Sequence, residues 1–93
     1  MDEITLEEIL THYISRVRIA MENIEKQKKD IEQLVELLDD GISGNIKEAL
    51  NDKLEESIDE TDEIYDHLED TMFFLKRQLN EVEEAIIESY SLF

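Results

Sequence analysis

Apolar side chains recur with helical spacing over most of the chain, on both sides of one short interruption. In residues 5 to 40, one row repeats every seven positions: Leu10, Val17, Ile24, Ile31 and Leu38. A second row runs beside it, with Gln27 as its polar member: Leu6, Tyr13, Ala20 and Leu34. A further flank widens the stripe: Ile14, Met21 and Val35. A stripe of this width is typical of a helix that contacts more than one neighbour, as in a bundle.

Residues 45 to 89 carry a stripe of the same kind. Its first row contains Leu54, Leu68, Leu75 and Val82, and Thr61 interrupts it. Its second row contains Ile58, Tyr65, Met72, Leu79 and Ile86. Since the chain has no proline, nothing forces a break within either stretch, and the pattern predicts a second long helix.

Both glycines of the chain lie between the two predicted helices. We expect Gly41 to end the first helix at a position of positive φ, and Gly44 with Asn45 to begin the second. The sequence therefore predicts an all-α, antiparallel helical hairpin formed by residues 1–93 as a single domain. Helix one spans about residues 5–40, the turn 41–44, and helix two about residues 45–89.

The start of the first helix has its own signal. Thr5 and Glu8 form a capping box, in which each side chain bonds the backbone amide of the other, and Ile4 with Ile9 supplies the hydrophobic staple.

Two helices packed only on each other leave about half of each helix exposed, so we expect a dimer that forms a four-helix bundle. The predicted partner interface comprises Leu10, Val17, Ile24, Ile31, Leu54, Leu68, Leu75, Val82, Ile86, Tyr90 and Phe93. Facing residues should have numbers that add to about 85, which places Thr5 level with Asn80. The apolar residues from Val82 to Phe93 would then lack cover within the chain, and a second chain should cover them.

The charge balance narrows the class of partner. The 9 basic and 26 acidic side chains give a net charge of -17, which argues against nucleic acid and anionic membrane surfaces as ligands. The sequence contains no apolar run long enough for membrane insertion, and Met1-Asp2-Glu3 lacks the layout of a signal peptide. The chain has no cysteine, which excludes disulfides and thiolate metal sites.

Each of two charged clusters could be either a functional site or an ordinary solvated helix face. Lys26, Lys28 and Lys29 lie among acidic residues, and we interpret them as a solvated helix face. The stretch from Glu55 to Asp70 contains no Lys or Arg and could suggest a metal site. A helical dimetal site needs inward Glu-x-x-His pairs, whereas Glu63 and His67 are four apart, so a solvated acidic face is the better interpretation and no metal or cofactor is expected.

Groups that would converge for catalysis are missing from the pattern. No serine is placed to meet a histidine, no glycine-rich phosphate loop occurs, and a rod of two helices has no pocket that excludes water. We interpret His12 as a surface residue, and Tyr13 and Tyr65 as core residues with their hydroxyls at the edge. The sequence predicts a protein that is not an enzyme.

The turn Ile42-Ser43-Gly44, followed by Ala49, Leu50 and Leu54, resembles the Trp-x-Gly turn and following apolar residues of the small WXG (ESAT-like) proteins of type VII secretion. Gly44 matches the motif glycine, and Ile42 stands in place of the motif tryptophan. Tyr90 is similar in position to the tyrosine of that family's Tyr-x-x-x-Asp/Glu export signal. Small proteins encoded with larger LXG-type toxins show the same hairpin with altered motifs.

The resemblance implies a bacterial protein, cytoplasmic before export, that is secreted without a signal peptide or that targets a larger effector. Its partner would be a second copy or the helical N-terminal domain of that effector. Two other functions stay open on the sequence: an acidic inhibitor or nucleic-acid mimic that occupies a basic groove, motivated by the run from Glu55 to Asp70, and a coiled-coil scaffold or chaperone subunit.

Overall fold

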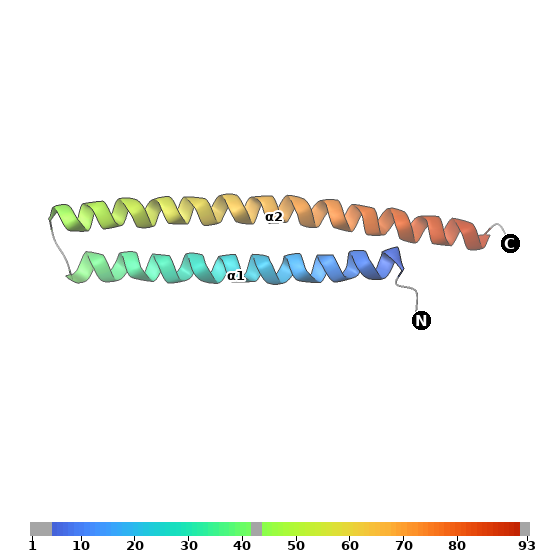
Figure 1. Ribbon diagram of the computed structural model, residues 1–93, viewed down its shortest axis with the longest axis horizontal. Coiled ribbons are helices and arrows are strands. Elements are labelled where there is room, and N and C mark those ends of the chain that lie inside the picture. The colour runs from blue at the N-terminus through green and yellow to red at the C-terminus, as the bar shows by residue number, and fades with distance from the viewer. Residues whose placement is uncertain (1–4, 42–43, 92–93) are drawn as a thin grey trace.

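The computed structural model describes residues 5–41 and 44–91, which form two long antiparallel helices lying side by side (Figure 1). Helix α1 spans Leu6–Gly41 and helix α2 spans Asn45–Ser91. The predicted all-α hairpin is confirmed. The molecule measures 75 × 25 × 15 Å with a radius of gyration of 21.2 Å, whereas a compact domain of this length would have a radius of roughly 12 Å. The hairpin is a rod, and its core is the contact between its two helices.

Helix α1 begins where the sequence predicts. The backbone N–H of Glu8 donates to Oγ1 of Thr5 over 3.1 Å, and the N–H of Ile9 donates to the Thr5 carbonyl over 3.1 Å. Glu7 and Glu8 in the first turn are favoured by the positive end of the helix dipole. The Thr5 half of the capping box is thus present. Ile4 of the predicted staple lies outside the described residues.

The turn differs from the prediction at Gly41. Gly41 is the last residue of α1 and does not have positive φ, whereas Gly44 has a φ of 89°. The Gly44 carbonyl accepts the N–H of Glu48 over 3.3 Å, so Gly44 stands directly before the first turn of α2. The positive φ is required where the chain enters the second helix, not where it leaves the first. Ile42 and Ser43 lie outside the described residues.

The two helices meet along a seam whose positions alternate by three and four residues, as in a coiled coil. On α1 the seam contains Leu10, Ile14, Val17, Met21, Ile24, Lys28, Ile31, Val35 and Leu38. On α2 it contains Leu54, Ile58, Thr61, Tyr65, Leu68, Met72, Leu75, Leu79 and Val82. Leu10, Ile14, Thr61 and Met72 are buried, and the others are half-buried. One helix cannot enclose the other, so burial stays partial.

The hydrogen bonding of Thr61 explains how a polar residue can stand in the apolar row of α2. Its hydroxyl donates to the carbonyl of Ile58 over 2.7 Å, which satisfies the polar atom within α2. The side chain can therefore be buried, at 7 % exposure, without an unpaired hydroxyl.

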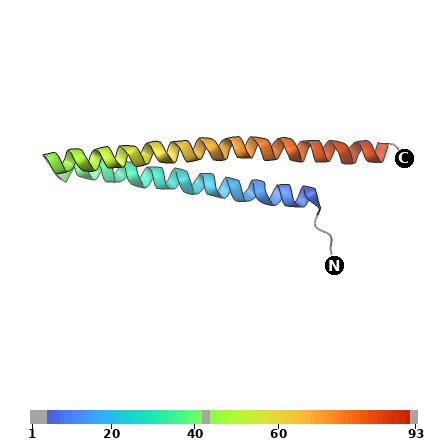
Figure 2. The ribbon, with the colours of Figure 1, turned by 45° about the horizontal axis from the view of Figure 1, so that its top comes forward.

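Relative to the prediction, α2 is shifted along α1 toward the hinge by about one helical turn. Lys28 pairs with Asp62, so facing residue numbers add to 90 at this point instead of 85. Leu6 lines a common hollow with Val82, Ala85 and Ile86, which the prediction placed beyond α1. Because α1 continues through Gly41 before the chain reverses, residues of α2 lie closer to the hinge than expected. Helix α2 extends past the start of α1 at the open end (Figures 1 and 2).

Candidate partner-binding face

The hairpin has two faces, one on each side of the seam, and they differ in charge. On the first, which we call the charged face, α1 contributes Thr11, Arg18, Glu25, Glu32 and Asp39. Helix α2 contributes Glu48, Glu55, Asp62, Glu69, Lys76, Glu83 and Tyr90. Ten of these twelve residues are ionisable as Asp, Glu, Lys or Arg, so this face stays in contact with water.

Ion pairs cross the seam on the charged face. Nζ of Lys28 lies 2.7 Å from Oδ1 of Asp62, and Nζ of Lys47 lies 3.4 Å from Oδ1 of Asp39. Asp39 is in the last turn of α1, where the helix dipole disfavours a carboxylate, and Lys47 offsets that charge from the other side of the hinge. Two carboxylates of the charged face, Asp62 and Asp39, are therefore paired within the chain.

Lys28 corrects one prediction. It was expected on a solvated face with Lys26 and Lys29, but it occupies a seam position between Met21 and Val35. Its stem packs between the helices while its ammonium reaches Asp62, as long basic side chains commonly do. The hydrogen bond to Asp62 raises the pKa of Lys28, and burial opposes the shift less strongly. The acidic run of α2 is thus partly paired within the chain.

Tyr65 lies beside this ion pair. A small hollow is lined by Lys28, Asp62, Tyr65 and Glu25, together with Ile24 and Thr61. The hydrogen bond from the Tyr65 hydroxyl to Glu25 raises the pKa of Tyr65, and burial and nearby carboxylates act in the same direction. Tyr65 is half-buried in the seam, as predicted for a core tyrosine with its hydroxyl at the edge. Tyr13 is different: at 55 % exposure it lies outside the hairpin core, beside the ring of His12.

The opposite face, which we call the uncharged face, carries no charged residue in the two rows next to the seam. Helix α1 contributes Leu6, Tyr13, Ala20, Gln27 and Leu34. Helix α2 contributes Leu50, Ser57, Ile64, Thr71, Gln78 and Ala85. In a chain that is 38 % charged, eleven neutral positions on one face indicate selection against charge there.

The two uncharged rows lie on the same side of the hairpin. Near the hinge, Leu34, Leu37 and Leu38 of α1 line one hollow with Leu50, Lys53 and Leu54 of α2. At the open end, Leu6 shares a hollow with Ala85. Large apolar residues are exposed at both ends and between them: Leu37 is 66 % and Ile46 69 % exposed near the hinge, and Phe74 is 58 % exposed between the ends. A continuous, partly apolar surface is available for a further helix.

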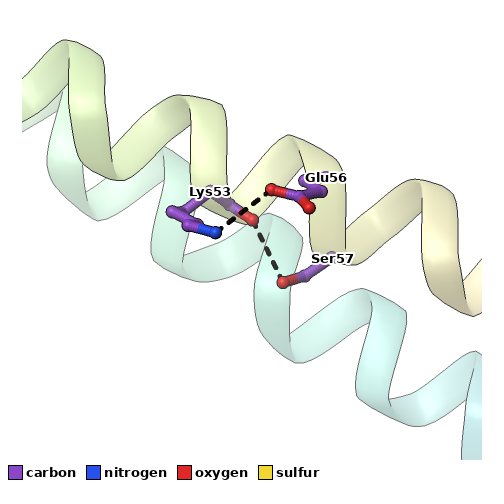
Figure 3. Close-up of polar contacts among 3 residues, drawn as sticks. All are labelled: Lys53, Glu56 and Ser57. Carbon is purple, nitrogen blue, oxygen red and sulfur yellow. Dashed lines mark hydrogen bonds and ion pairs between the residues drawn. The ribbon is translucent and has the colours of Figure 1, made fainter.

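The serine and threonine hydroxyls on the uncharged face are satisfied within their own helix. Oγ of Ser57 donates to the carbonyl of Lys53 over 3.0 Å, and Oγ1 of Thr71 donates to the carbonyl of His67 over 3.0 Å (Figure 3 shows Ser57). Covering these residues would leave no hydroxyl unpaired, so their burial carries little cost.

Lys53 stands at the rim of this face. Its Nζ lies 3.4 Å from Oε2 of Glu56 on the same helix, and both side chains are largely exposed (Figure 3). An exposed pair of this kind contributes little to stability, so Lys53 can exchange Glu56 for a carboxylate on a partner at small cost.

The predicted interface residues separate into three groups. The first lies in the seam between α1 and α2: Leu10, Val17, Ile24, Ile31, Leu54, Leu68, Leu75 and Val82. The second, Ile86 and Tyr90, is exposed at the open end, and the third, Phe93, lies outside the described residues. Side chains of the first group make the contact between the helices of one chain. The uncharged row of α2 was missed because only Leu50 and Ile64 in it are large and apolar; the absence of charge at every seventh position was the available signal.

No group of three or more His, Asp or Glu side chains in residues 5–41 and 44–91 could hold a metal ion. Neither of the two described helices is long and apolar enough to cross a membrane. The hollows lie open along the outside of a rod.

Comparison with models of known protein families, with curated proteins and with solved structures found no match to this chain.

Proposed function

We propose that this protein is a non-enzymatic, WXG-like partner protein of type VII secretion that pairs helix against helix through its uncharged face. The observation that carries the proposal is the contrast between the two faces of one hairpin. A monomer in water has no use for a neutral, partly apolar surface along its full length, whereas a bundle interface requires one.

The exposed apolar side chains support the same function. Leu37, Ile46 and Phe74 are each more than half exposed, and every large side chain among them that a partner buries contributes roughly 1.5 to 3 kcal/mol before the cost of association. Pairing into a four-helix bundle, with a second copy or with the helical N-terminal domain of a larger effector, would cover them. Export or targeting of the resulting complex is the function that the resemblance to WXG proteins implies.

A matched pair of substitutions tests the pairing function. Leu50→Asp puts a charge in the uncharged face, and Glu48→Gln removes one from the charged face two residues away. In purification from the native source, we expect the wild-type chain and Glu48→Gln to retain a helical partner identified by mass, and Leu50→Asp to lose it. Retention of the partner by Leu50→Asp would contradict the proposal.

The secretion role has a separate test. We expect the protein, or the effector that it accompanies, in the culture medium of the native host, and we expect Tyr90→Ala to reduce that amount while Tyr13→Ala does not. Tyr90 is 79 % exposed and accessible to a receptor, and Tyr13 is also exposed but lies near the start of α1. Equal secretion of the wild-type chain and both variants would contradict the proposed export signal at Tyr90. The pairing function would be unaffected by that result.

A second function, binding of a basic protein by an acidic mimic, is supported by the acidic run that α2 carries from Glu55 to Asp70. The salt dependence of binding distinguishes the two functions. Association through the uncharged face should strengthen as salt screens the repulsion between acidic partners, whereas binding of a basic groove should weaken steeply. Sedimentation at salt concentrations between 50 mM and 500 mM shows whether association strengthens or weakens with salt.

A further inference from the structure

The hollow near the hinge combines an apolar lining with one charged side chain. Lys53 is the charged member, and the others are leucines, three from α1 and two from α2: Leu34, Leu37, Leu38, Leu50 and Leu54. We call it the leucine hollow. Leu34, Leu37 and Leu50 are exposed to water and line the same hollow, so they form one apolar surface and are not scattered single residues. A surface of this kind favours a ligand with an apolar body.

Lys53 defines the chemistry of the polar end of such a ligand. Its Nζ lies 3.4 Å from Oε2 of Glu56, which does not line the hollow, and both side chains are largely exposed. Because water competes for both groups, this ion pair contributes little, and a carboxylate on the ligand can take the place of Glu56. An ammonium donates charge-assisted hydrogen bonds to a carboxylate. The leucine hollow therefore fits an alkyl chain that ends in a carboxylate.

The hollow at the open end lacks this combination. Its lining, within the part of the chain that the structure describes, contains no basic side chain: Leu6, Val82, Ala85, Ile86, Ser89 and Tyr90. An apolar molecule can contact either hollow, but only the leucine hollow offers an ammonium to an anionic one. The open end is therefore a comparison site within the same molecule.

The size of the leucine hollow sets the length of the chain. The hollow has a volume of 390 Å³, within the range of roughly 300 to 1,000 Å³ that is common for small-molecule sites. If each heavy atom takes about 30 Å³, the share of one molecule in liquid water, the hollow holds roughly thirteen heavy atoms. Decanoate and dodecanoate are of this size.

We propose that the leucine hollow binds a straight-chain carboxylate of the size of decanoate, with its alkyl chain on the five leucines and its carboxylate on Lys53. The inference goes beyond the proposed pairing function and does not depend on it. The net charge of -17 repels an anion at long range, but salt screens that repulsion beyond about 8 Å, whereas the contact with Lys53 is at short range.

The bound chain has a consequence for the uncharged face. It covers Leu34 and Leu50, which belong to that face as well as to the leucine hollow. The ligand and a partner helix would therefore exclude each other near the hinge.

A titration with octanoate, decanoate and dodecanoate, each below its micelle concentration, measures the apolar contribution. The methyl resonances of Leu37 and Leu50 should shift, with a Kd on the order of 1 mM for decanoate. A fully buried methylene strengthens binding about fourfold, and the open hollow covers about half of the chain, so each added methylene should strengthen binding about twofold. Absence of these shifts, or an affinity that does not depend on chain length, would overturn the proposal.

A lysine substitution tests the charge. Lys53→Gln should weaken octanoate binding about threefold and leave octanol binding unchanged, because the alcohol carries no charge. Lys26→Gln, at an exposed position of α1 outside the hollow, removes the same charge from the chain and should bind both probes as the wild-type chain does. A Lys53→Gln chain that binds octanoate as tightly as the Lys26→Gln chain would overturn the proposal.

Two leucine substitutions locate the site. Leu37 and Leu6 are each more than half exposed, near opposite ends of α1, so Leu37→Asn and Leu6→Asn should both keep the fold, which circular dichroism checks. Leu37→Asn should weaken decanoate binding about fivefold, whereas Leu6→Asn should not change it. In the wild-type chain, the methyl resonances of Leu6 should shift less than those of Leu37, and this comparison decides the location even if a variant unfolds. Equal shifts at Leu6 and Leu37 would show general adsorption to exposed apolar side chains and would overturn the leucine hollow as the binding site.

Discussion

Lys28 of α1 and Asp62 of α2 form an ion pair of 2.7 Å in the middle of an otherwise largely apolar seam. The pair lies where the lysine cluster of α1 is level with the acidic run of α2, so the two charged segments face each other in the antiparallel arrangement. Sliding one helix by a turn would separate them. We infer that this pair helps to define the register of the hairpin, while the apolar seam residues supply most of its stability.

The ion pair can be separated from the seam by two substitutions. Lys28→Met suits a half-buried seam position and removes the charge, so its thermal midpoint should equal or exceed that of the wild type. Asp62→Asn leaves Lys28 without its carboxylate and should lower the midpoint by a few degrees. Circular dichroism at pH 7 and one fixed protein concentration measures both. A lower midpoint for Lys28→Met than for Asp62→Asn would show that the ion pair outweighs apolar packing.

The stability of the folded chain should fall at alkaline pH. Asp62, with a contribution from Glu32, raises the pKa of Lys28, and Glu25 with Glu69 and Asp66 raises the pKa of Tyr65. A group whose pKa is higher in the folded chain stabilises the fold below its unfolded pKa, and this contribution is lost as pH rises through the folded value. The midpoint should therefore decline above about pH 10. Tyr65→Phe removes one titrating group and should decline less steeply; superimposable curves would contradict the assignment.

The two glycines should respond in opposite directions to alanine. At Gly44, with a φ of 89°, Ala is strained and should lower the free energy of unfolding by roughly 1 to 2 kcal/mol. At Gly41, which is helical, Ala should raise it by up to about 1 kcal/mol. An added Cβ meets no atom within 4 Å at either position, so the difference isolates backbone conformation. Urea unfolding of both variants measures it, and a shared sign would be inconsistent with the turn described here.

The start of α1 offers a comparison of two threonines. Thr5→Ala removes the side-chain acceptor of the Glu8 N–H and should cost about 1 kcal/mol. Thr11→Ala removes a hydroxyl that only bonds back to the carbonyl of Glu7 within the helix, and the cost should be close to zero. Equal losses in denaturant unfolding would show that the cap at Thr5 contributes nothing specific.

The open end of α2 should matter for assembly more than for folding. Deleting residues 86–93 removes the exposed side chains of Ile87 and Tyr90, while most of α2 remains paired with α1. Circular dichroism should show most of the helicity retained, and sedimentation should show weaker self-association. Glu84→Gln, two residues before the deleted stretch, is the control for a change of charge alone. An unchanged dimer in the truncated chain would exclude this end from the interface.

Several features followed from the sequence because their causes are local. Helical periodicity predicted both helices, and Thr5 with its following glutamate predicted where α1 begins, since a cap depends on residues a few positions apart. The glycine pair located the hinge. The sequence assigned the positive φ to Gly41 as well as permitting it at Gly44, because both glycines are equally able to adopt it and the choice depends on how α2 is entered.

The tertiary structure decided which row of each broad stripe becomes the seam. On α1, the row of Leu10 and the row of Leu6 have the same period, and nothing within one helix states which of them faces the neighbour. Packing of α1 on α2 sets that rotation: it places Lys28 inside the seam and leaves Leu6 and Leu34 on the uncharged face. The axial offset between the two helices likewise depends on both helices together. Local sequence determines that a helix forms, whereas its rotation and offset are determined by the side chains that it meets.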